Sequence, residues 1–278
     1  ALWRGRKKAY GAFGRLTPDL MVQDATVPRS TLPDVLREID RIGARYGLPV
    51  ANVFHAGDGN LHPKLLFDRR DAELVERVEK ASKEMMEACV RVGGTITGEH
   101  GVGLDKRDYM PLVHTPRELA LQARVQAAFD PTGVWNPGKV LPDALGGTPD
   151  ELQREAPGAP TGGDGGRTFE HRPADLTLRV SAEVPWLEME PVLARAQQWV
   201  PLDAPGLEGS TVGELVERGA WGPLAPASGR LRDLVLGATL VTRGGERARL
   251  GGQVMKNVAG FDLVRALVGS RGRLGEIE

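Results

Sequence analysis

The stretch FHAGDGNLHP, residues 54–63, decides how the first half of this chain is interpreted. Asp58-Gly59 between two apolar runs predicts a β-hairpin, because a two-residue type I′ turn needs positive φ at both central positions and this dipeptide tolerates it. With these residues at the turn, His55 is expected to pair directly with His62, with Cβ atoms roughly 4.5–5.5 Å apart on one face of the ladder. Two imidazoles held that close predict a metal site as well as a hairpin.

Helix and strand patterns alternate around this hairpin. The sequence predicts its two strands over 49–56 and 60–68, helices from Ser30 to Gly47, over 71–93 and over 116–130, and a short strand over 95–97. Cap residues and early prolines open these helices, and Gly or Pro follows them, as is typical of helix ends. The order predicts an α+β fold in which helices cover one face of an antiparallel sheet.

Composition narrows the class of protein. The chain has 278 residues, of which 41% are hydrophobic and 26% charged, and its net charge is −1. This balance predicts a packed core and gives no reason to expect nucleic acid as a partner. Cys89 is the single cysteine, which excludes an internal disulfide framework and fits a reducing, cytoplasmic compartment. No apolar run approaches the ~20 residues of a transmembrane segment, and the N-terminus lacks the apolar core of a signal peptide.

A change in composition divides the chain. Residues 143–168 are rich in Gly, Pro and charge, which predicts a linker between a first domain, 1–142, and a second, 169–278. The second domain is expected to contain strands within 175–184 and 234–242, helices near 186–199 and 211–219, and a hairpin turn at Gly244-Gly245. The chain does not begin with Met and ends on a strand-like run, so we expect both ends to fall within domains.

The motifs GEHGVG at 98–103 and NPGK at 136–139 accompany the hairpin motif. Together the three resemble the C-terminal domain of FAD-linked oxidases, the substrate-side domain of vanillyl-alcohol-oxidase-like flavoproteins that oxidise D-2-hydroxy acids. Within this family the likeness is to the D-type subunits of bacterial glycolate oxidases, and it covers residues 1–142. The resemblance implies a ferredoxin-like α+β domain with the antiparallel sheet and helices described above.

The second region resembles a different subunit type. GSTVGELVERG at 209–219, KNVAGFDL at 256–263 and VGSRGRLGEIE at 268–278 are similar to the FAD-binding domain of E-type glycolate oxidase subunits. This resemblance implies FAD-binding residues, namely Gly209, Ser210, Thr211, Val212, Gly213, Asn257, Gly260, Asp262, Gly275 and Ile277. Ordinary tight turns are the alternative explanation of the glycines.

The upstream phosphate-binding loop of such domains has no counterpart before residue 169. We therefore expect a partial FAD-binding domain of the vanillyl-alcohol-oxidase type, which binds FAD poorly by itself. A natural fusion, a frameshift product and an artefact of gene calling all remain open as origins of the joined halves.

The family resemblance also assigns the metal site. In the D-2-hydroxy-acid dehydrogenase branch, the residues corresponding to His55, His62 and Glu99 bind a divalent metal. Two imidazoles and one carboxylate suit zinc or a similar ion and leave coordination positions for a substrate. His100 is the implied catalytic base, because a neutral imidazole accepts an alcohol proton near neutral pH. A hydrogen-bonded structural role is the alternative for any histidine taken alone.

The resemblance implies two substrate-binding residues, Arg6 and Asn60. Arg6 matches the family arginine that holds the substrate carboxylate, and a guanidinium fork suits that group. The alternative for Arg6 is a solvated basic helix end, and for Asn60 a role in the turn.

The implied reaction is flavin-dependent oxidation of a short D-2-hydroxy acid, glycolate or D-lactate, to the 2-oxo acid. FAD and a divalent metal are the implied cofactors, and other glycolate oxidase subunits, including an iron–sulfur subunit, are the implied partners. With one cysteine, the chain itself cannot ligate a four-cysteine cluster. The implied location is cytoplasmic, peripheral to the inner membrane through partner subunits. Two rival functions stay open: a non-catalytic assembly subunit or composite fragment that does not bind FAD by itself, and a flavin-independent metal hydrolase.

Overall fold

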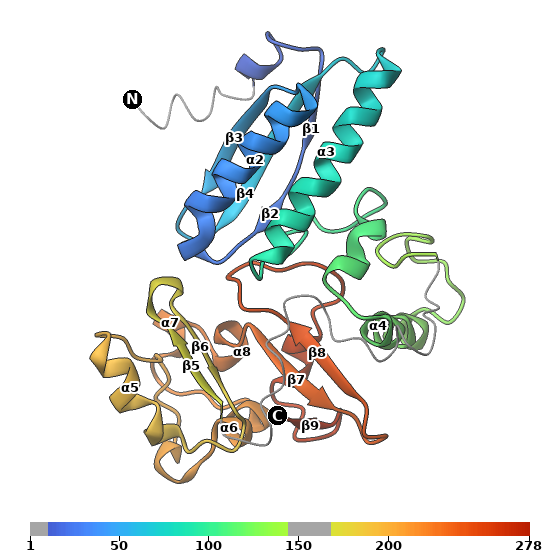
Figure 1. Cartoon of the computed structure of the whole chain (residues 1–278). Helices are drawn as coiled ribbons and strands as arrows, with labels where there is room; N and C mark the ends of the chain where they lie inside the picture. The colour runs from blue at the N-terminus through green and yellow to red at the C-terminus, as the bar shows by residue number, and fades with distance from the viewer. Residues whose placement is uncertain (1–10, 144–167) are drawn as a thin grey trace.

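The computed structural model describes residues 11–143 and 168–278. The first part is a four-stranded antiparallel sheet with two helices side by side on one face (Figure 1). Its elements are β1 (Asp19–Val22), β2 (Ala25–Thr26), α2 (Leu32–Tyr46), β3 (Val50–His55), β4 (Asn60–Phe67) and α3 (Ala72–Arg91). Strand β4 is central, because it pairs with β3 along one edge and with both β1 and β2 along the other. The predicted α+β class is confirmed.

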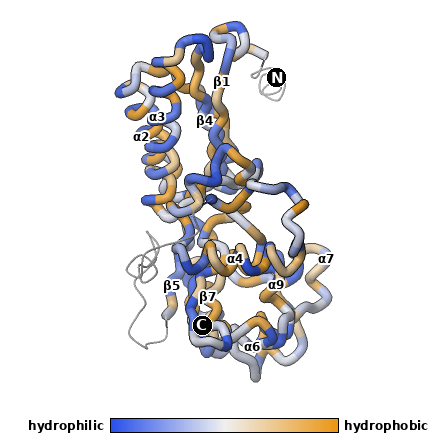
Figure 2. Tube along the Cα trace, turned by 90° about the vertical axis from the view of Figure 1, so that its right-hand side faces the viewer, coloured by the Kyte–Doolittle hydropathy of each residue, from blue (hydrophilic) through white to orange (hydrophobic). Residues whose placement is uncertain are grey.

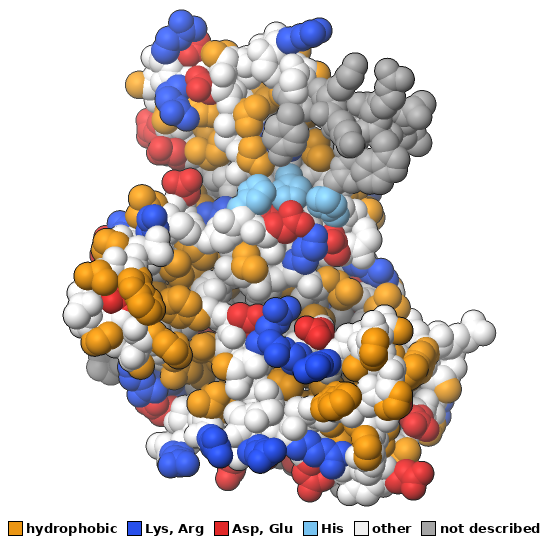
Figure 3. All heavy atoms as spheres, turned by 180° about the vertical axis from the view of Figure 1, so that it is seen from behind, with side chains coloured by type: hydrophobic (Ala, Val, Ile, Leu, Met, Phe, Trp, Pro, Cys, Tyr) orange, Lys and Arg blue, Asp and Glu red, His pale blue; other side chains and the backbone are white. Residues whose placement is uncertain are grey.

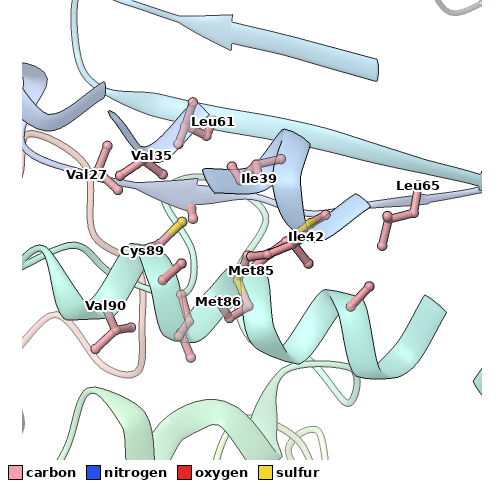
Figure 4. Packing of buried hydrophobic residues seen from close by; sticks show 14 of the residues in the cluster. Val27, Val35, Ile39, Ile42, Leu61, Leu65, Met85, Met86, Cys89 and Val90 are labelled. Atoms are coloured by element: carbon pink, nitrogen blue, oxygen red, sulfur yellow. The ribbon is translucent and has the colours of Figure 1, made fainter. Parts of the chain in front are cut away.

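The core of this part lies between the sheet and the two helices. Leu61 and Leu65 of β4 are fully buried against Ile39 of α2 and Met85 of α3 (Figure 4). Hydrophilic and hydrophobic residues alternate along both helices, as is typical of helices that bury one side (Figure 2). Successive side chains of a strand point to opposite faces, so Asn60, His62 and their cross-strand neighbours occupy the face turned away from the helices.

The predicted helices of this part form close to their predicted ends. Asp71 caps α3 by accepting a hydrogen bond from the backbone N–H of Leu74. Pro33 stands in the first turn of α2, and Gly47 ends that helix at φ 65°. A third helix, α4 (Pro116–Phe129), begins with a reciprocal pair of bonds between Thr115 and Glu118. Two short 3-10 helices complete this part, η1 (Arg29–Thr31) and η2 (Arg107–Leu112).

The hairpin forms, but its predicted register was wrong by two residues. His55 pairs with Asn60, and His62 pairs with Val53. The turn contains four residues, and Gly59 alone among them has positive φ, at 72°. A type I′ turn therefore does not form, because it needs positive φ at two successive residues. Since side chains alternate with a period of two, this shift leaves both histidines on the same face.

The predicted strand over 95–97 was also too long. Thr95 makes one isolated bridge to Thr26, and residues 96 and 97 belong to the loop that follows. This loop carries Glu99 and His100 and is hydrogen-bonded to Asp24, between β1 and β2. Conversely, β1 and β2 were not predicted from the sequence, because short strands carry little periodic signal.

The second part has two small antiparallel sheets, which are β5 with β6 and β8-β7-β9. Its strands are β5 (Phe169–Arg172), β6 (Thr177–Val180), β7 (Gly237–Val241), β8 (Arg247–Gly251) and β9 (Glu276–Ile277). Its helices are η4 (Pro173–Asp175), η5 (Trp186–Glu188), α5 (Glu190–Arg195), η6 (Leu207–Gly209), α6 (Val212–Arg218), α7 (Ala225–Ser228), α8 (Leu231–Leu234) and α9 (Leu263–Leu267). The hairpin at Gly244-Gly245 is confirmed by the pairing of β7 with β8. The helix predicted near 186–199 is shorter, since α5 ends at Arg195.

Hydrogen bonds join the two parts. The Val258 N–H donates to the Thr97 carbonyl at 3.1 Å, and the Thr95 hydroxyl donates to Asn257 Oδ1 at 3.0 Å. These contacts place residues 256–260 of the second part beside the loop that carries Glu99 and His100. Most of the predicted linker, residues 144–167, lies outside the described residues. None of the helices in 11–143 or 168–278 has the length and apolar character needed to cross a bilayer.

Candidate metal and substrate site

Four of the predicted site residues meet at the end of the first sheet. His55 ends β3, His62 lies in β4, and Glu99 and His100 come from the loop after Thr95. The His62 ring meets the His55 ring edge-on, with centroids 5.5 Å apart, and stacks on the His100 ring at 5.1 Å. Figure 3 shows histidine side chains gathered at one place on the surface, beside acidic and basic side chains.

The three predicted metal ligands can serve one ion. His55, His62 and Glu99 each offer a ligand atom, and these atoms lie within 4.8 Å of one another. His62 Nε2 is 3.6 Å from Glu99 Oε2. Zinc binds nitrogen and oxygen at about 2.0–2.2 Å, so ligands on one ion stand roughly 3–4 Å apart. The donor set and its spacing therefore fit a divalent ion of that kind, and the metal site stays a prediction.

Asp24 holds the loop that supplies Glu99 and His100. Its fully buried carboxylate accepts, at Oδ2, hydrogen bonds from the Thr97 hydroxyl at 2.7 Å and from the N–H groups of Gly98, Glu99 and His100 at 3.0, 2.9 and 2.8 Å. Burial opposes ionisation of this carboxyl, but these donors together with nearby Lys106 outweigh it and lower its pKa. Asp24 is therefore a carboxylate at neutral pH and fixes the path of the loop.

His62 is the most buried of the clustered histidines. Burial lowers its pKa, and the positive charge of a protonated His100 acts in the same direction, while Asp24 and Glu99 oppose the shift. The imidazole is therefore neutral at neutral pH, which is the form that binds a metal. Its Nδ1 has no hydrogen-bond partner in the part of the chain that the structure describes.

The second part of the chain also contributes to this site. Lys256 forms ion pairs with Asp58 of the hairpin turn, at 2.8 Å, and with Glu99. The hydrogen bond from Lys256 holds the pKa of Glu99 below its usual range. Burial disfavours the charged form of Lys256, but Asp58 and Glu99 outweigh this effect and raise the pKa of Lys256. Glu99 is thus ionised before any metal arrives.

The two predicted substrate-binding residues differ in what the structure shows. Asn60 is fully buried beneath Gly98, where an added Cβ would lie 2.6 Å from Asn60 Nδ2. Neither amide atom of Asn60 has a hydrogen-bond partner among the described residues. A buried amide of that kind is costly unless something else pairs with it. Arg6 lies outside the described residues.

Comparison with known proteins assigns the family. Residues 1–140 match the family described as FAD linked oxidases, C-terminal domain, and residues 166–251 match the FAD binding domain family. The chain belongs to the FAD-linked oxidases.

Several curated relatives match the first half of this FAD-linked oxidase. The glycolate oxidase subunit GlcD of Escherichia coli is 48% identical over 140 residues, which is 50% of this chain and 28% of the relative. GlcD of Bacillus subtilis is 42% identical over 141 residues, 51% of this chain and 30% of the relative. A probable mitochondrial D-lactate dehydrogenase of Danio rerio is 35% identical over 144 residues, 50% of this chain and 29% of the relative. The chain therefore spans less than a third of each of these relatives.

The predicted flavin residues of this FAD-linked oxidase fall into two groups. Val212, Gly213, Asn257 and Ile277 line a cleft of about 1310 Å³, which residues of the first part, such as Thr95, also line. This volume is ample for a cofactor. The other six predicted residues have structural roles in the fold. Thr211 and Asp262 cap α6 and α9, the Ser210 hydroxyl donates to the Gly206 carbonyl, and Gly209 ends η6. Gly260 and Gly275 lie where a Cβ would collide with Gln122 and Val241.

The backbone of 210–213 offers few donors to a phosphate. Its four N–H groups already donate within the chain, to Leu207 O, Glu214 Oε2, Val184 O and Ala182 O. A flavin pyrophosphate could use these donors only by replacing those bonds. The described residues thus provide room for FAD but not a ready phosphate cradle, and the flavin contacts stay predictions.

The sequence analysis missed several residues of this site. Asp24 and Lys256 stand far from the histidine motifs in the chain, and nothing in their local patterns indicates the contacts they make. Buried Lys106 was also missed; it donates to the carbonyl oxygens of Asp24 at 2.8 Å and Ile96 at 3.0 Å. Lys106 stands in the charged run 105–108, so no local signal distinguishes it from its neighbours.

Proposed function

We propose that this FAD-linked oxidase supplies the substrate- and metal-binding side of an enzyme that oxidises a short D-2-hydroxy acid, glycolate or D-lactate, to the 2-oxo acid. The observation that carries the proposal is the convergence of His55, His62, Glu99 and His100 from three separate segments onto one spot. The names of the relatives, glycolate oxidase subunit and D-lactate dehydrogenase, support this substrate class.

His55, His62 and Glu99 would hold a divalent metal, zinc or a similar ion. The ion would supply Lewis acidity toward a substrate hydroxyl, and FAD would supply the hydride acceptor. His100 would accept the hydroxyl proton at a ring nitrogen. Its backbone is anchored to Asp24, and its ring rests on His62, so its position is well defined. Arg6 would bind the substrate carboxylate.

The proposal includes partners and location. Because the bacterial relatives are named as subunits, we place this chain in an oxidase complex with other glycolate oxidase subunits, including an iron–sulfur subunit that carries electrons onward. The complex would be cytoplasmic and peripheral to the inner membrane through those partners.

A second candidate function is an assembly subunit or composite fragment that does not bind FAD by itself. The occupied N–H groups of residues 210–213 favour it. The hydrolase alternative has less support, because the contacts of residues 256–260 with the site have no role in such a reaction.

The test uses the purified chain with FAD and a divalent metal under anaerobic conditions. The proposed oxidase bleaches bound flavin on addition of glycolate or D-lactate, and His100→Gln slows bleaching by about 10²-fold or more while metal content is unchanged. Lys80→Gln is the control, since Lys80 is exposed on α3 and pairs with Glu76. Flavin that binds but is not bleached by any D-2-hydroxy acid would favour the assembly subunit. Metal-dependent ester hydrolysis without flavin would favour the hydrolase.

A further inference from the structure

The two oxygen atoms of Asp24 have different surroundings. Oδ2 accepts the four hydrogen bonds from residues 97–100. Oδ1 is buried, lacks a hydrogen-bond partner among the described residues, and lies 3.7 Å from His62 Nδ1. His62 Nδ1 is itself buried and unpartnered across the described ranges. Asp24 Oδ1, which can only accept a hydrogen bond, therefore faces His62 Nδ1, and neither atom has another hydrogen-bond partner among the described residues.

The sheet register explains why they meet. Val22 stands opposite Lys64, and Ala25 stands opposite Leu61. The alignment of β1 and β2 with β4 is thus continuous, which places Asp24 directly opposite His62. Directly opposed residues share a face of the sheet. The contact is built into the sheet and does not depend on a mobile surface side chain.

We propose that Asp24 is a positioning residue that holds His62 in its Nδ1–H tautomer and so directs the Nε2 lone pair toward the metal. This inference rests on the proposed function for the role of that metal and deepens it. A carboxylate oxygen has no proton to donate, so pairing with it requires the imidazole proton on Nδ1. A neutral imidazole has one such proton, and Glu99 Oε2 lies at a similar distance from Nε2, 3.6 Å. The Glu99 carboxylate already pairs with Lys256, whereas Asp24 Oδ1 has no hydrogen-bond partner among the described residues, so we assign the proton to Nδ1 and leave Nε2 as an acceptor.

His100 and Lys106 also lie near Asp24, but neither hydrogen-bonds to Oδ1. A ring nitrogen of His100 lies within 4.8 Å of an Asp24 carboxylate oxygen. Lys106 Nζ donates to two backbone carbonyl oxygens and stands 3.9 Å from Oδ2, the oxygen that the loop already uses. Closing the gap of 3.7 Å to a hydrogen bond of about 2.9 Å needs only a small side-chain adjustment. The result is a carboxylate that orients a metal-binding histidine through its second nitrogen, which is a common arrangement at metal sites.

The substitution Asp24→Asn separates the two roles of Asp24. The amide keeps the shape of the carboxylate, and its oxygen can still accept the bonds from residues 97–100. Its NH₂ group must then face His62 Nδ1 and donate to it, which forces the imidazole proton onto Nε2. The loop stays in place while the predicted ligand atom is blocked.

The experiment measures the His62 tautomer by long-range ¹H–¹⁵N NMR on the metal-free full chain at about pH 8, where neutral imidazole predominates. The wild-type chain is expected to show Nδ1–H and Asp24→Asn to show Nε2–H. Zinc affinity, measured by competition with a chelating dye, is expected to fall by about 10–100-fold in Asp24→Asn. Thr97→Val is the matched control, because it removes one hydrogen bond to Asp24 Oδ2 and leaves Oδ1 untouched. The His62 tautomer and the zinc affinity of this variant should equal those of the wild-type chain.

A wild-type chain in which His62 carries its proton on Nε2 would overturn the proposal, and this measurement does not require the variant to fold. It would also be overturned by an Asp24→Asn chain that keeps both the wild-type tautomer and the wild-type zinc affinity. A wild-type chain that shows Nδ1–H but binds no metal would support the positioning role of Asp24 and contradict the proposed function. The two failures are therefore distinguishable.

Discussion

Lys256, from the second part of the chain, forms an ion pair with Asp58 in the hairpin turn of the first part, with Nζ 2.8 Å from Oδ2. The same ammonium group contacts Glu99. One side chain therefore connects residues 256–260 to the predicted metal site, and the electrostatics of that site depend on both parts of the chain.

Replacing Lys256 by Met is expected to raise the pKa of Glu99 toward its ordinary value, because the hydrogen bond that lowers it is lost. Carboxyl ¹³C NMR titration of metal-free chain measures this shift. Lys139→Met is the control, since Lys139 is exposed and its described bond is to Asn136. An unchanged titration of Glu99 in Lys256→Met would show that the ion pair does not persist in solution.

Removing either clustered histidine is expected to lower bound metal. His55→Ala and His62→Ala each delete one of the three predicted ligands, and loss of one ligand should reduce zinc retained after desalting to well below one ion per chain. Metal analysis of the purified proteins measures it. His171→Ala, away from the cluster, should retain the wild-type amount. Unchanged metal content in both site variants would rule out this ligand set.

The purified chain is expected to lose FAD on desalting. The cleft has room for a flavin, but the N–H groups of residues 210–213 are already bonded within the chain. The ratio of flavin absorbance to protein absorbance after gel filtration measures retention. A stoichiometric yellow protein would contradict this expectation and would show that the segment rearranges to receive the pyrophosphate.

The buried ammonium of Lys106 predicts a rise of stability with pH. Burial lowers the pKa of Lys106 from 10.5 to about 8. Between these values the unfolded chain binds more protons than the folded chain, so the free energy of unfolding increases with pH, by at most ~3 kcal/mol. Urea unfolding near pH 7.5 and near pH 9.5 measures it.

Lys106→Met lacks this titrating group and serves as the comparison. Wild type should gain stability relative to Lys106→Met as the pH rises. A constant difference between the two proteins at both pH values would contradict the lowered pKa. If Lys106→Met does not fold, NMR titration of the Lys106 side chain in the wild-type chain gives the same answer directly.

Much of the fold follows from local patterns. The helices at Leu32–Tyr46, Ala72–Arg91 and Pro116–Phe129 have cap residues and apolar spacing that are readable without coordinates. Strands β1 and β2 were not readable, because two to four residues give no clear alternation. The hairpin register was misjudged because Asp58 does not adopt the positive φ that a type I′ turn needs. The close approach of the Val27 carbonyl, 2.1 Å from where a Cβ of Gly59 would lie, is likewise not contained in any local rule.

The sequence by itself determined the identity of the clustered residues. It placed His55 and His62 on one face of a hairpin, since the period of two survives an even shift in register, and its motifs singled out Glu99 and His100. Only the tertiary structure decided what surrounds them. Asp24 meets His62 because β2 pairs with β4, and Lys256 meets Glu99 because the second part packs against the loop. Such contacts join residues far apart in the chain, and they depend on the packing of whole elements.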